Sequence, residues 1–460
     1  MKPLHLQAFS PAAHIARRTR LMQTMESLGG GVALIPTAPE VIRNRDAHYD
    51  YRADSTFFYL TGFNEPEALL LLIAHADTQK SVLFCRTKSE EREIWDGYRF
   101  GPEAAQAHFG VDLALPIEEL SEHLPTFFAN QAAIFAPLLE NTDLDVTLRQ
   151  ALNTARAASR SGATTPPTLR DIYALTDEMR LTKDDTELEW LRAAGRISAA
   201  GHIRAMQTCR VGMLETDLEA EILYSFARAG AQFPAYSSIV ATGANACVLH
   251  YRAGFSTLKD GDLCLIDAGA EYGNYAGDIT RTFPVNGKFS PAQRAVYEVV
   301  LDAQKAAIAA THIGATFMQP HDAAVRVLTQ GMLDLGLLDR NIVGNVNDAI
   351  ESRAYQRFYM HRTGHWIGLD VHDCGAYSEG QHDGQPIWRD LHENMMLTIE
   401  PGLYIRPTEG VDERFWHIGI RIEDDAIVTA NGCELTTRDV PVEIDAIEYL
   451  MKHHQEPHGS

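Results

Sequence analysis

The stretch LCLIDAGAEYGNYAGDITRTF (residues 263–283) is the part of the chain that says most about its fold. An apolar, strand-like run ends at Asp267, and Asp278 stands between small residues and a β-branched run. A single aspartate after a strand is usually a turn or helix cap. An unpaired charge among apolar residues is nevertheless costly. Because other segments repeat this arrangement, we expect the fold to compensate these charges.

Two further segments carry a carboxylate in apolar surroundings. Glu400 follows an apolar run in LTIEPGLYI (397–405) and precedes Pro-Gly. In IGIRIEDD (418–425), Arg421 and Glu423 share one strand face and three isoleucines share the other. If the isoleucines pack, the polar face lines a cleft in which Arg421 can fix the Glu423 carboxylate. A surface ion pair is the alternative role for Arg421.

The segment HRTGHWIGLDVHD (361–373) holds three histidines and two aspartates around a glycine-rich apolar centre. Taken with the carboxylates above, it completes a set of four carboxylates and one imidazole: Asp267, Asp278, His365, Glu400 and Glu423. Such hard donors suit two divalent cations, with manganese expected first and cobalt, zinc or iron as alternatives. Bridging carboxylates let five side chains serve two ions roughly 3.5 to 4 Å apart.

Composition excludes several classes of protein. The 460 residues exceed one ordinary core, so two or three domains are expected. No apolar run is long enough to cross a bilayer. A net charge of -22 disfavours nucleic acid and anionic membranes as partners. The six cysteines form no C-x-x-C pair, which indicates a reducing cytoplasm. The basic segment IARRTRLMQTM (15–25) could belong to a transit peptide, but we favour the first helix of the folded chain.

Hydrophobic patterning indicates two domains, 1–175 and 176–460. Helix-like segments alternate with apolar runs in the first third, which predicts an α/β domain. The runs are GVALIP at 31–36, ALLLLIA at 68–74, SVLFC at 81–85 and AAIFA at 132–136. The segment from Thr165, TPPTLRDIYALTDEMRL, has the composition of an interdomain connection followed by a short element. Thr182 and Asp185 then have capping-box spacing, which predicts a long helix.

The five candidate ligands, in this order and spacing, resemble those of the pita-bread metallopeptidases. The motifs NACVLHY (245–251) and HWIGLDVHD (365–373) are most similar to Xaa-Pro aminopeptidases (aminopeptidase P). The first domain agrees, since NRDAHYDYRADSTFFYLTGFNEPEA (44–68) and EIWDGYRFG (93–101) resemble the amino-terminal domain of those enzymes. The stretch GAYSEGQHDGQPIWRDLHENMM (375–396) departs from the pattern by its length, and ENM replaces the common Pro-Gly-Met. That departure puts loop geometry and substrate reach in doubt.

The resemblance implies an α/β (α+β) architecture in which an amino-terminal α/β domain precedes a pita-bread catalytic domain like that of creatinase and methionine aminopeptidase. It implies that Asp267 binds one metal, that His365 and Glu400 bind the other, and that Asp278 and Glu423 bridge them. A hydroxide shared by the two metals would cleave the bond between any N-terminal residue and a following proline. Glu400 would move the proton.

Other residues are assigned roles by the same resemblance. His250, His361 and His372 should converge on the cleft and hydrogen-bond the substrate, and Tyr404 orients a ligand or packs. Asp46 is expected to pair with Arg421 across the domain interface. A pocket for proline is needed because most peptidases use the N–H that proline lacks. Trp95 and the aromatics of residues 51–63 are candidates for its wall, from this or a neighbouring subunit, with core packing the default for most.

Peptides with proline at the second position are therefore the expected partners, and a homo-oligomer, dimer or tetramer, is the expected assembly. The nearest alternative is a proline dipeptidase with the same metals and chemistry. A non-catalytic pita-bread module would need neither the five ligands nor the three accessory histidines. Within HRTGHWIGLDVHD, we expect Trp366, Ile367 and Leu369 to anchor the segment in the core. Local hydrogen bonding is the default for Asp370 and Asp373.

Overall fold

The computed structural model describes residues 10–75 and 78–453. The chain divides between Met179 and Arg180 into two compact units, inside helix α7 (Tyr173–Leu181). The segment in which we expected an interdomain connection followed by a short element contains strand β8 (Thr168–Asp171), which pairs in parallel with the sheet of the first unit, and then α7. All four residues of β8 are exposed, so this edge strand carries no apolar pattern.

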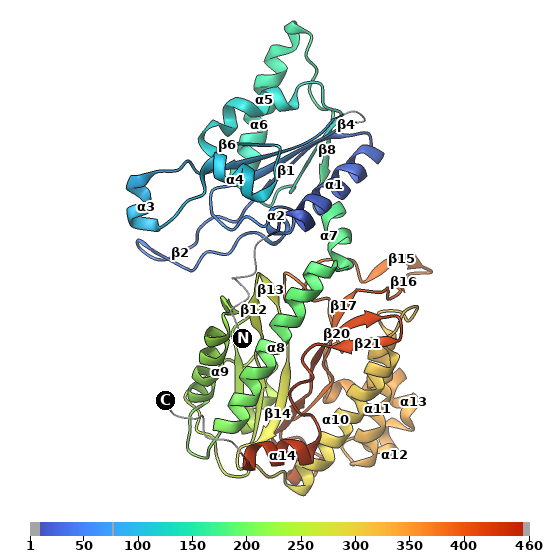
Figure 1. Cartoon of the computed structure of the whole chain (residues 1–460). Coiled ribbons are helices and arrows are strands. Elements are labelled where there is room, and N and C mark those ends of the chain that lie inside the picture. The colour runs from blue at the N-terminus through green and yellow to red at the C-terminus, as the bar shows by residue number, and fades with distance from the viewer. Residues whose placement is uncertain (1–9, 76–77, 454–460) are drawn as a thin grey trace. The chain divides into compact units, whose positions relative to one another are not determined.

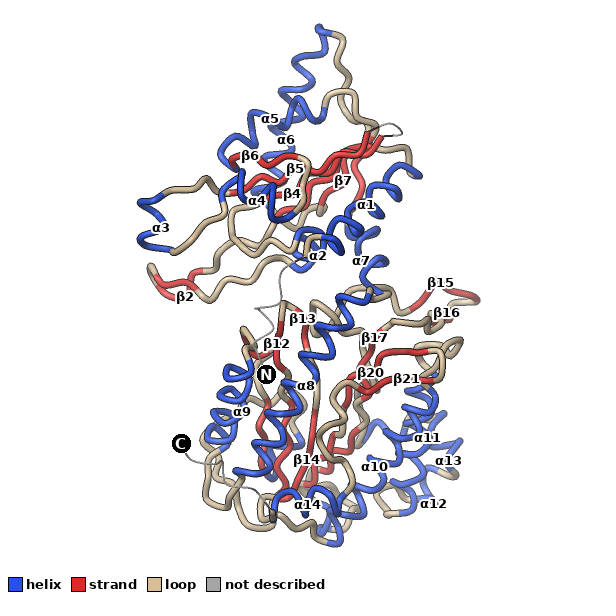
Figure 2. The backbone as a smooth tube through the Cα atoms, in the orientation of Figure 1, coloured by secondary structure: helices blue, strands red, loops and turns tan. Residues whose placement is uncertain are grey.

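A six-stranded mixed sheet forms the centre of the first unit, in the order β6-β5-β4-β1-β7-β8 (Figures 1 and 2). Besides β8, its strands are β1 (Gly31–Pro36), β4 (Leu69–His75), β5 (Thr78–Cys85), β6 (Leu113–Pro116) and β7 (Ala133–Ala136). The four predicted apolar runs are β1, β4, β5 and β7, so this part of the α/β prediction is confirmed. A short hairpin, β2 (Ile42–Asn44) with β3 (Ala47–His48), lies outside the sheet.

Helices cover both faces of this sheet. They are α1 (Ala12–Ser27), α2 (Ser55–Thr61), α4 (Gly101–Phe109), α5 (Leu120–Phe128) and α6 (Thr142–Ala157). Helix α3 (Glu90–Asp96) has no buried residue and lies away from the sheet (Figure 2). Helix α1 confirms the helical interpretation of the basic segment. Its Arg18 is buried and donates to the main-chain carbonyls of Leu60 and Gly110, so the charge is used structurally. Phe57 is buried in the core, whereas Trp95 is 81% exposed.

The second unit begins with a long helix whose N-terminus differs from our prediction. Helix α8 (Asp185–Thr208) is capped by Asp184, whose side chain accepts from the Glu187 amide while Glu187 accepts from the Asp184 amide, both at 3.0 Å. The predicted box of Thr182 with Asp185 is therefore wrong. Thr182 instead forms a bridge with Met395.

Small antiparallel sheets follow in the second unit. They are β10-β11-β14, β13-β12-β9, β17-β20-β21, β18-β19 and the hairpin β15-β16. The strands are β9 (Phe233–Pro234), β10 (Ile239–Thr242), β11 (Leu263–Asp267), β12 (Ala270–Tyr272), β13 (Tyr275–Ala276), β14 (Thr280–Pro284), β15 (Ser378–His382), β16 (Gln385–Trp388), β17 (Met396–Ile399), β18 (Gly402–Ile405), β19 (Ile418–Arg421), β20 (Asp424–Thr429) and β21 (Gly432–Leu435).

Helix pairs flank these strands within the unit. Helices α8 and α9 contact the sheets of β10 and β12, and α10 contacts β17, β19 and β21 while packing on α11 (Figure 2). The remaining helices are α9 (Glu215–Ala229), α10 (Pro291–Ala310), α11 (Gln319–Asp334), α12 (Arg340–Val343), α13 (Val346–Glu351) and α14 (Ile444–Lys452). No helix among residues 10–75 and 78–453 is long and apolar enough to cross a membrane.

One predicted strand is divided in two at the functional carboxylate. Residues 419–429 appeared continuous in sequence, but β19 pairs with β18 and β20 pairs with β17. Between them, the Glu423 amide donates to the Thr280 carbonyl at 3.1 Å. The alternating faces persist, since Ile420 and Ile422 are buried in the main core while Arg421 and Glu423 face a pocket.

Candidate metal centre

A cavity of about 290 Å³ in the catalytic unit collects the residues singled out above. Its lining consists of Leu249, His250, Asp267, Asp278, His361, Arg362, Gly364, His365, His372, Tyr377, Glu400, Arg421 and Glu423. All five expected ligands and the three accessory histidines are among them. Tyr404 is buried beside the cavity and hydrogen-bonds two of its lining residues.

The four carboxylates lie at or near the ends and junctions of strands. Asp267 is the last residue of β11 and pairs with Thr280 on β14, while Asp278 lies two residues before that partner. Glu400 directly follows β17, and Glu423 occupies the junction of β19 and β20. Residues distant in sequence therefore meet at one point because several sheets end there.

His365 reaches this point from a loop held against β17. The His365 amide donates to Thr398 Oγ1 at 3.2 Å, and the Thr398 amide donates to the His365 carbonyl at 2.9 Å. Its Nδ1 donates to the Trp366 carbonyl at 2.9 Å, which leaves Nε2 as the nitrogen available for a metal. Trp366, like Ile367 and Leu369, is buried, so the predicted anchoring of this segment is confirmed.

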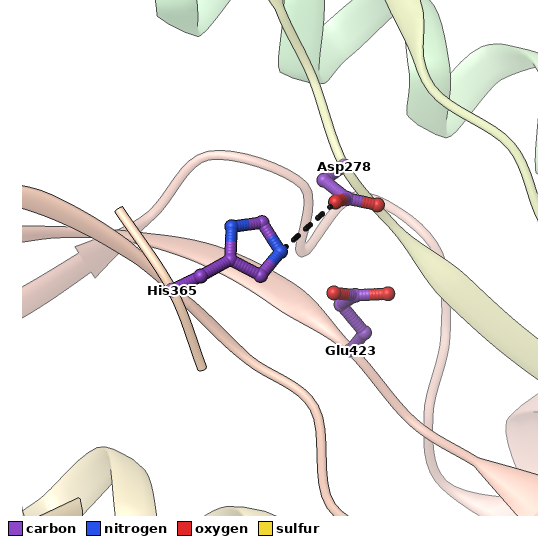
Figure 3. Close-up of side chains that lie close together, drawn as sticks. All are labelled: Asp278, His365 and Glu423. Atoms are coloured by element: carbon purple, nitrogen blue, oxygen red, sulfur yellow. Dashed lines mark ion pairs between the residues drawn. The ribbon is translucent and has the colours of Figure 1, made fainter. Parts of the chain in front are cut away.

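The donor atoms lie close enough to share cations. His365 Nε2 is 3.5 Å from Asp278 Oδ2 and 3.8 Å from Glu400 Oε1. Asp278, His365 and Glu423 offer donor atoms that lie within 4.8 Å of one another (Figure 3). Asp278 and Glu423 are 5% and 2% exposed, respectively. Water cannot therefore screen their repulsion effectively.

The pKa shifts of the clustered side chains indicate that the cluster needs positive charge. Burial, reinforced by Asp278 and Glu400, raises the pKa of Glu423 well above its usual range. Burial likewise raises the pKa of Asp267, and it raises the pKa of Glu400 to about 7 against the opposing charge of His365. Burial alone would lower the pKa of His365, but the Asp278 hydrogen bond and the Glu400 charge raise it to about 9. This donor set fits two divalent cations, which would supply the missing positive charge.

Arg421 is tied to the site differently from our expectation. Its guanidinium donates to Asp267 Oδ2, to Thr280 Oγ1 at 3.0 Å and to the Tyr404 hydroxyl at 2.9 Å. Thr280 Oγ1 in turn donates to Glu423 Oε2 at 2.6 Å. The hydrogen bonds of Arg421 thus hold Asp267 directly and reach Glu423 only through Thr280. The alternative prediction, that Arg421 forms an ion pair on the surface, is wrong because Arg421 is 4% exposed.

Two groups around the carboxylates were not identified from sequence. The Tyr236 hydroxyl contacts Asp267 Oδ1 at 2.5 Å and Asp278 Oδ1 at 2.6 Å. Asp425 Oδ2 accepts from the Asp278 amide at 2.9 Å. Tyr236 precedes β10 without a distinctive pattern, and Asp425 looks like an ordinary acidic residue of a strand. Only their three-dimensional neighbours distinguish them.

The accessory histidines occupy different environments. Burial, with the charge of Arg421, lowers the pKa of His361 to about 3, so its ring is neutral. Its Nδ1 donates to the Arg362 carbonyl at 2.7 Å, and its Nε2 accepts from the Tyr404 hydroxyl at 2.9 Å. The His372 ring centroid lies 4.1 Å from that of His365, and burial and the His365 charge lower its pKa. Asp46 belongs to the other unit, and its pairing with Arg421 stays a prediction.

A buried ion cluster fixes the loop that carries His372. Asp373 accepts from Arg180 Nη2 at 2.6 Å and from Lys183 Nζ at 2.7 Å, and Asp370 also accepts from Arg180 at 2.7 Å. The local hydrogen bonding expected of these aspartates is present, since Asp373 Oδ1 accepts from the Asp370 amide at 3.5 Å, but their charged partners lie about 190 residues earlier in the chain. The charges of these cations lower the pKa of Asp373 despite its burial. Gly368 leaves the necessary space, because a Cβ there would lie 2.2 Å from Asp373 Oδ2.

Asp373→Asn should lower the free energy of unfolding by roughly 3 to 5 kcal/mol, because it leaves buried Lys183 without its counter-charge and buried Arg180 with Asp370 as its remaining carboxylate partner. The measurement is urea unfolding of the protein after a chelator has removed its metal ions. Asp383→Asn is the matched control, since the Asp383 side chain is 90% exposed and its loss should cost less than about 0.5 kcal/mol. Equal stabilities of the two variants would contradict the assigned role of the ion cluster.

Comparison with known proteins agrees with this geometry. Residues 189–430 match metallopeptidase family M24, and residues 14–135 match the aminopeptidase P, N-terminal domain. The chain is 44% identical over 436 residues to an Escherichia coli protein named Xaa-Pro aminopeptidase, covering 95% of this chain and 96% of that one. It is 30% identical to the human Xaa-Pro aminopeptidase 3, covering 96% of this chain and 86% of the relative.

Solved structures give the same result for both domains. The structure of Pseudomonas aeruginosa aminopeptidase PepP superimposes with a TM-score of 0.91 at 46% identity, covering 96% of this chain and 98% of that one. A zinc-substituted Escherichia coli aminopeptidase P in complex with product gives a TM-score of 0.92 at 42% identity, covering 98% and 100%. The expected architecture is thereby confirmed. The chain belongs to metallopeptidase family M24, the members of which use divalent metal ions, and carries the aminopeptidase P type of amino-terminal domain.

Proposed function

We propose that this metallopeptidase is a Xaa-Pro aminopeptidase, which removes the N-terminal residue from peptides with proline at the second position. The observation that carries the proposal is the convergence of four carboxylates, one imidazole and three accessory histidines on one cavity. The names of relatives that match nearly the whole chain support the same substrate class.

We assign the ligands as the family resemblance implies, and the grouping of Asp278, His365 and Glu423 supports the assignment. Asp267 would hold one ion, His365 and Glu400 the other, and Asp278 and Glu423 both. Manganese is the first choice for this oxygen-rich set, with cobalt, zinc or iron as alternatives. When bound, two such ions act as Lewis acids on the scissile carbonyl and make water acidic enough to attack at neutral pH.

The protein side chains would position the substrate and move protons. Glu400, 3.7 Å from His361 and 3.8 Å from His365, is suited to accept a proton from the attacking water and to donate it to the leaving prolyl nitrogen. His250 and His372 can hydrogen-bond the substrate carbonyls and the developing oxyanion. The neutral His361 ring would join them by exchanging its Arg362 carbonyl or Tyr404 hydroxyl partner for the substrate. Arg421 and Tyr404 would act on the reaction through Asp267 and His361, which they hold in place.

Exposed apolar residues and free cysteines support the proposed assembly and location. Ile94, Trp95 and Tyr98 of the first unit are 82%, 81% and 62% exposed, an apolar surface that supports a homo-oligomer, dimer or tetramer. Scattered cysteines support a cytoplasmic location. A role for Trp95 in the proline pocket of a neighbouring subunit stays a prediction.

Peptides of different length test the proposed specificity. We expect hydrolysis of Ala-Pro-Ala and of longer Ala-Pro peptides, because an aminopeptidase needs no contact with a free carboxylate next to proline. Ala-Ala-Ala is the control for proline. Product analysis by chromatography decides the outcome: cleavage confined to Ala-Pro would favour a proline dipeptidase, and no cleavage of any Ala-Pro peptide by the metal-loaded protein would favour a binding module.

Glu423→Ala should reduce turnover by at least about a hundredfold and lower the metal content below two ions per chain, because it removes a shared ligand. Elemental analysis and Ala-Pro-Ala assays measure the two effects. Glu351→Ala, a change of the same kind on the exposed end of α13, should keep both values. Chelation should abolish the wild-type activity, and excess manganese should restore it. Normal metal content and turnover in Glu423→Ala would refute the ligand assignment.

A further inference from the structure

The cavity contains an arginine whose charge the rest of the site does not use. Arg362 and Arg421 both line it. Arg421 is committed to Asp267, Thr280 and Tyr404. In the described part of the chain, by contrast, no carboxylate lies within 4.0 Å of the Arg362 guanidinium, although four line the same cavity. Arg362 is exposed to solvent and therefore accessible to a ligand.

Aromatic rings hold this guanidinium in place. It lies over the rings of Tyr377 and Trp388, at 5.9 Å and 5.4 Å from their centroids. Tyr377 is itself fixed, since it stacks on buried Trp366 at 5.5 Å and packs against Phe317 at 4.6 Å. Contact with two aromatic rings orients a guanidinium while leaving its N–H edge free to donate hydrogen bonds.

The aromatic support comes from the segment that departs from the family pattern. Trp388 ends strand β16 and pairs with Ser378 of β15, directly after Tyr377. The Arg389 amide donates to the Tyr377 carbonyl at 3.0 Å, which closes the base of this hairpin. The long stretch 375–396 thus forms a hairpin whose base bears the two rings beside Arg362.

The main chain at Arg362 is equally constrained. His361 Nδ1 donates to the Arg362 carbonyl at 2.7 Å, and the Glu400 amide donates to the Thr363 carbonyl at 2.8 Å. Thr363 Oγ1 also contacts the Tyr359 hydroxyl at 2.6 Å. Arg362 is therefore carried by the same rigid segment as His361, which faces the proposed reaction centre.

We propose that Arg362 binds a carboxylate of the leaving peptide: the C-terminal carboxylate of a short substrate, or an acidic side chain on the residue after proline. This inference rests on the proposed function. A guanidinium fork pairs with carboxylates in two parallel hydrogen bonds. Because the two proposed metal ions would compensate the four carboxylates of the cavity, the charge of Arg362 is left over and would favour an anionic leaving group.

Three substrates separate the two sources of the carboxylate: Ala-Pro-Ala, Ala-Pro-Ala-amide and Ala-Pro-Asp-amide. For the wild-type protein we expect kcat/KM for Ala-Pro-Ala-amide, which carries no carboxylate, to be about five- to tenfold lower than for the two peptides that carry one. The difference should arise mainly from KM. In Arg362→Gln the difference should disappear with kcat on the amide unchanged, and Arg362→Lys should be intermediate. If, in the wild-type protein, Ala-Pro-Ala has a higher kcat/KM than Ala-Pro-Ala-amide but Ala-Pro-Asp-amide does not, the C-terminal carboxylate is the group that Arg362 binds.

Arg340→Gln is the control, since it removes the same charge from exposed helix α12, outside the cavity lining. Calorimetric binding of the products Pro-Ala and Pro-Ala-amide gives a second readout that needs no turnover, and it should show the same loss of discrimination in Arg362→Gln. Equal discrimination by wild type and Arg362→Gln in both measurements would overturn the inference while leaving Xaa-Pro cleavage intact. Absence of any Ala-Pro cleavage would instead overturn the proposed function.

Discussion

Mutual repulsion among buried carboxylates is the constraint around which the catalytic unit is arranged. Four of them line one cavity, and burial together with neighbouring negative charge raises the pKa of Glu423 well above its ordinary range. A protein cannot keep such groups ionised in a poorly solvated place without cations. Divalent metals bound by these residues would meet that need, and the same positive charge would serve to activate water and a peptide carbonyl. Stability of the site and its chemistry thus have one electrostatic origin.

Hydrogen bonds and ion pairs connect the polar groups around the cavity to the carboxylates and histidines that line it. Arg421 neutralises part of the negative charge of Asp267. Through Tyr404, it also orients the neutral His361 ring. A separate buried cluster of Arg180 and Lys183 with Asp373 holds the loop of His372. Each of these interactions joins segments far apart in the chain. They explain why the site needs several small sheets that end at a common point, each of which contributes one or two side chains.

Much of the first unit's architecture could be predicted from local pattern, since β1, β4, β5 and β7 are apolar runs. Strand β8 could not, because all its residues are exposed and its place in the sheet depends on hydrogen bonds to β7. The break between β19 and β20 was also invisible, because alternation continues through Ile422 and only the change of pairing partner separates the strands. The capping residue of α8 was misplaced by two positions for a related reason: two adjacent aspartates offered competing patterns.

Sequence alone predicted which five residues would line one cavity, because a carboxylate or imidazole in apolar surroundings leaves a local signature and the five residues follow one another in a recognisable order. Tertiary structure alone decided what surrounds them. Tyr236 became a partner of two carboxylates, and Asp373 became the centre of a buried ion cluster instead of a local cap. Arg362 became the cavity's arginine without a carboxylate partner among the residues described. Local sequence reports a residue's immediate neighbours, whereas charge compensation depends on which distant groups the folded chain brings within a few ångströms.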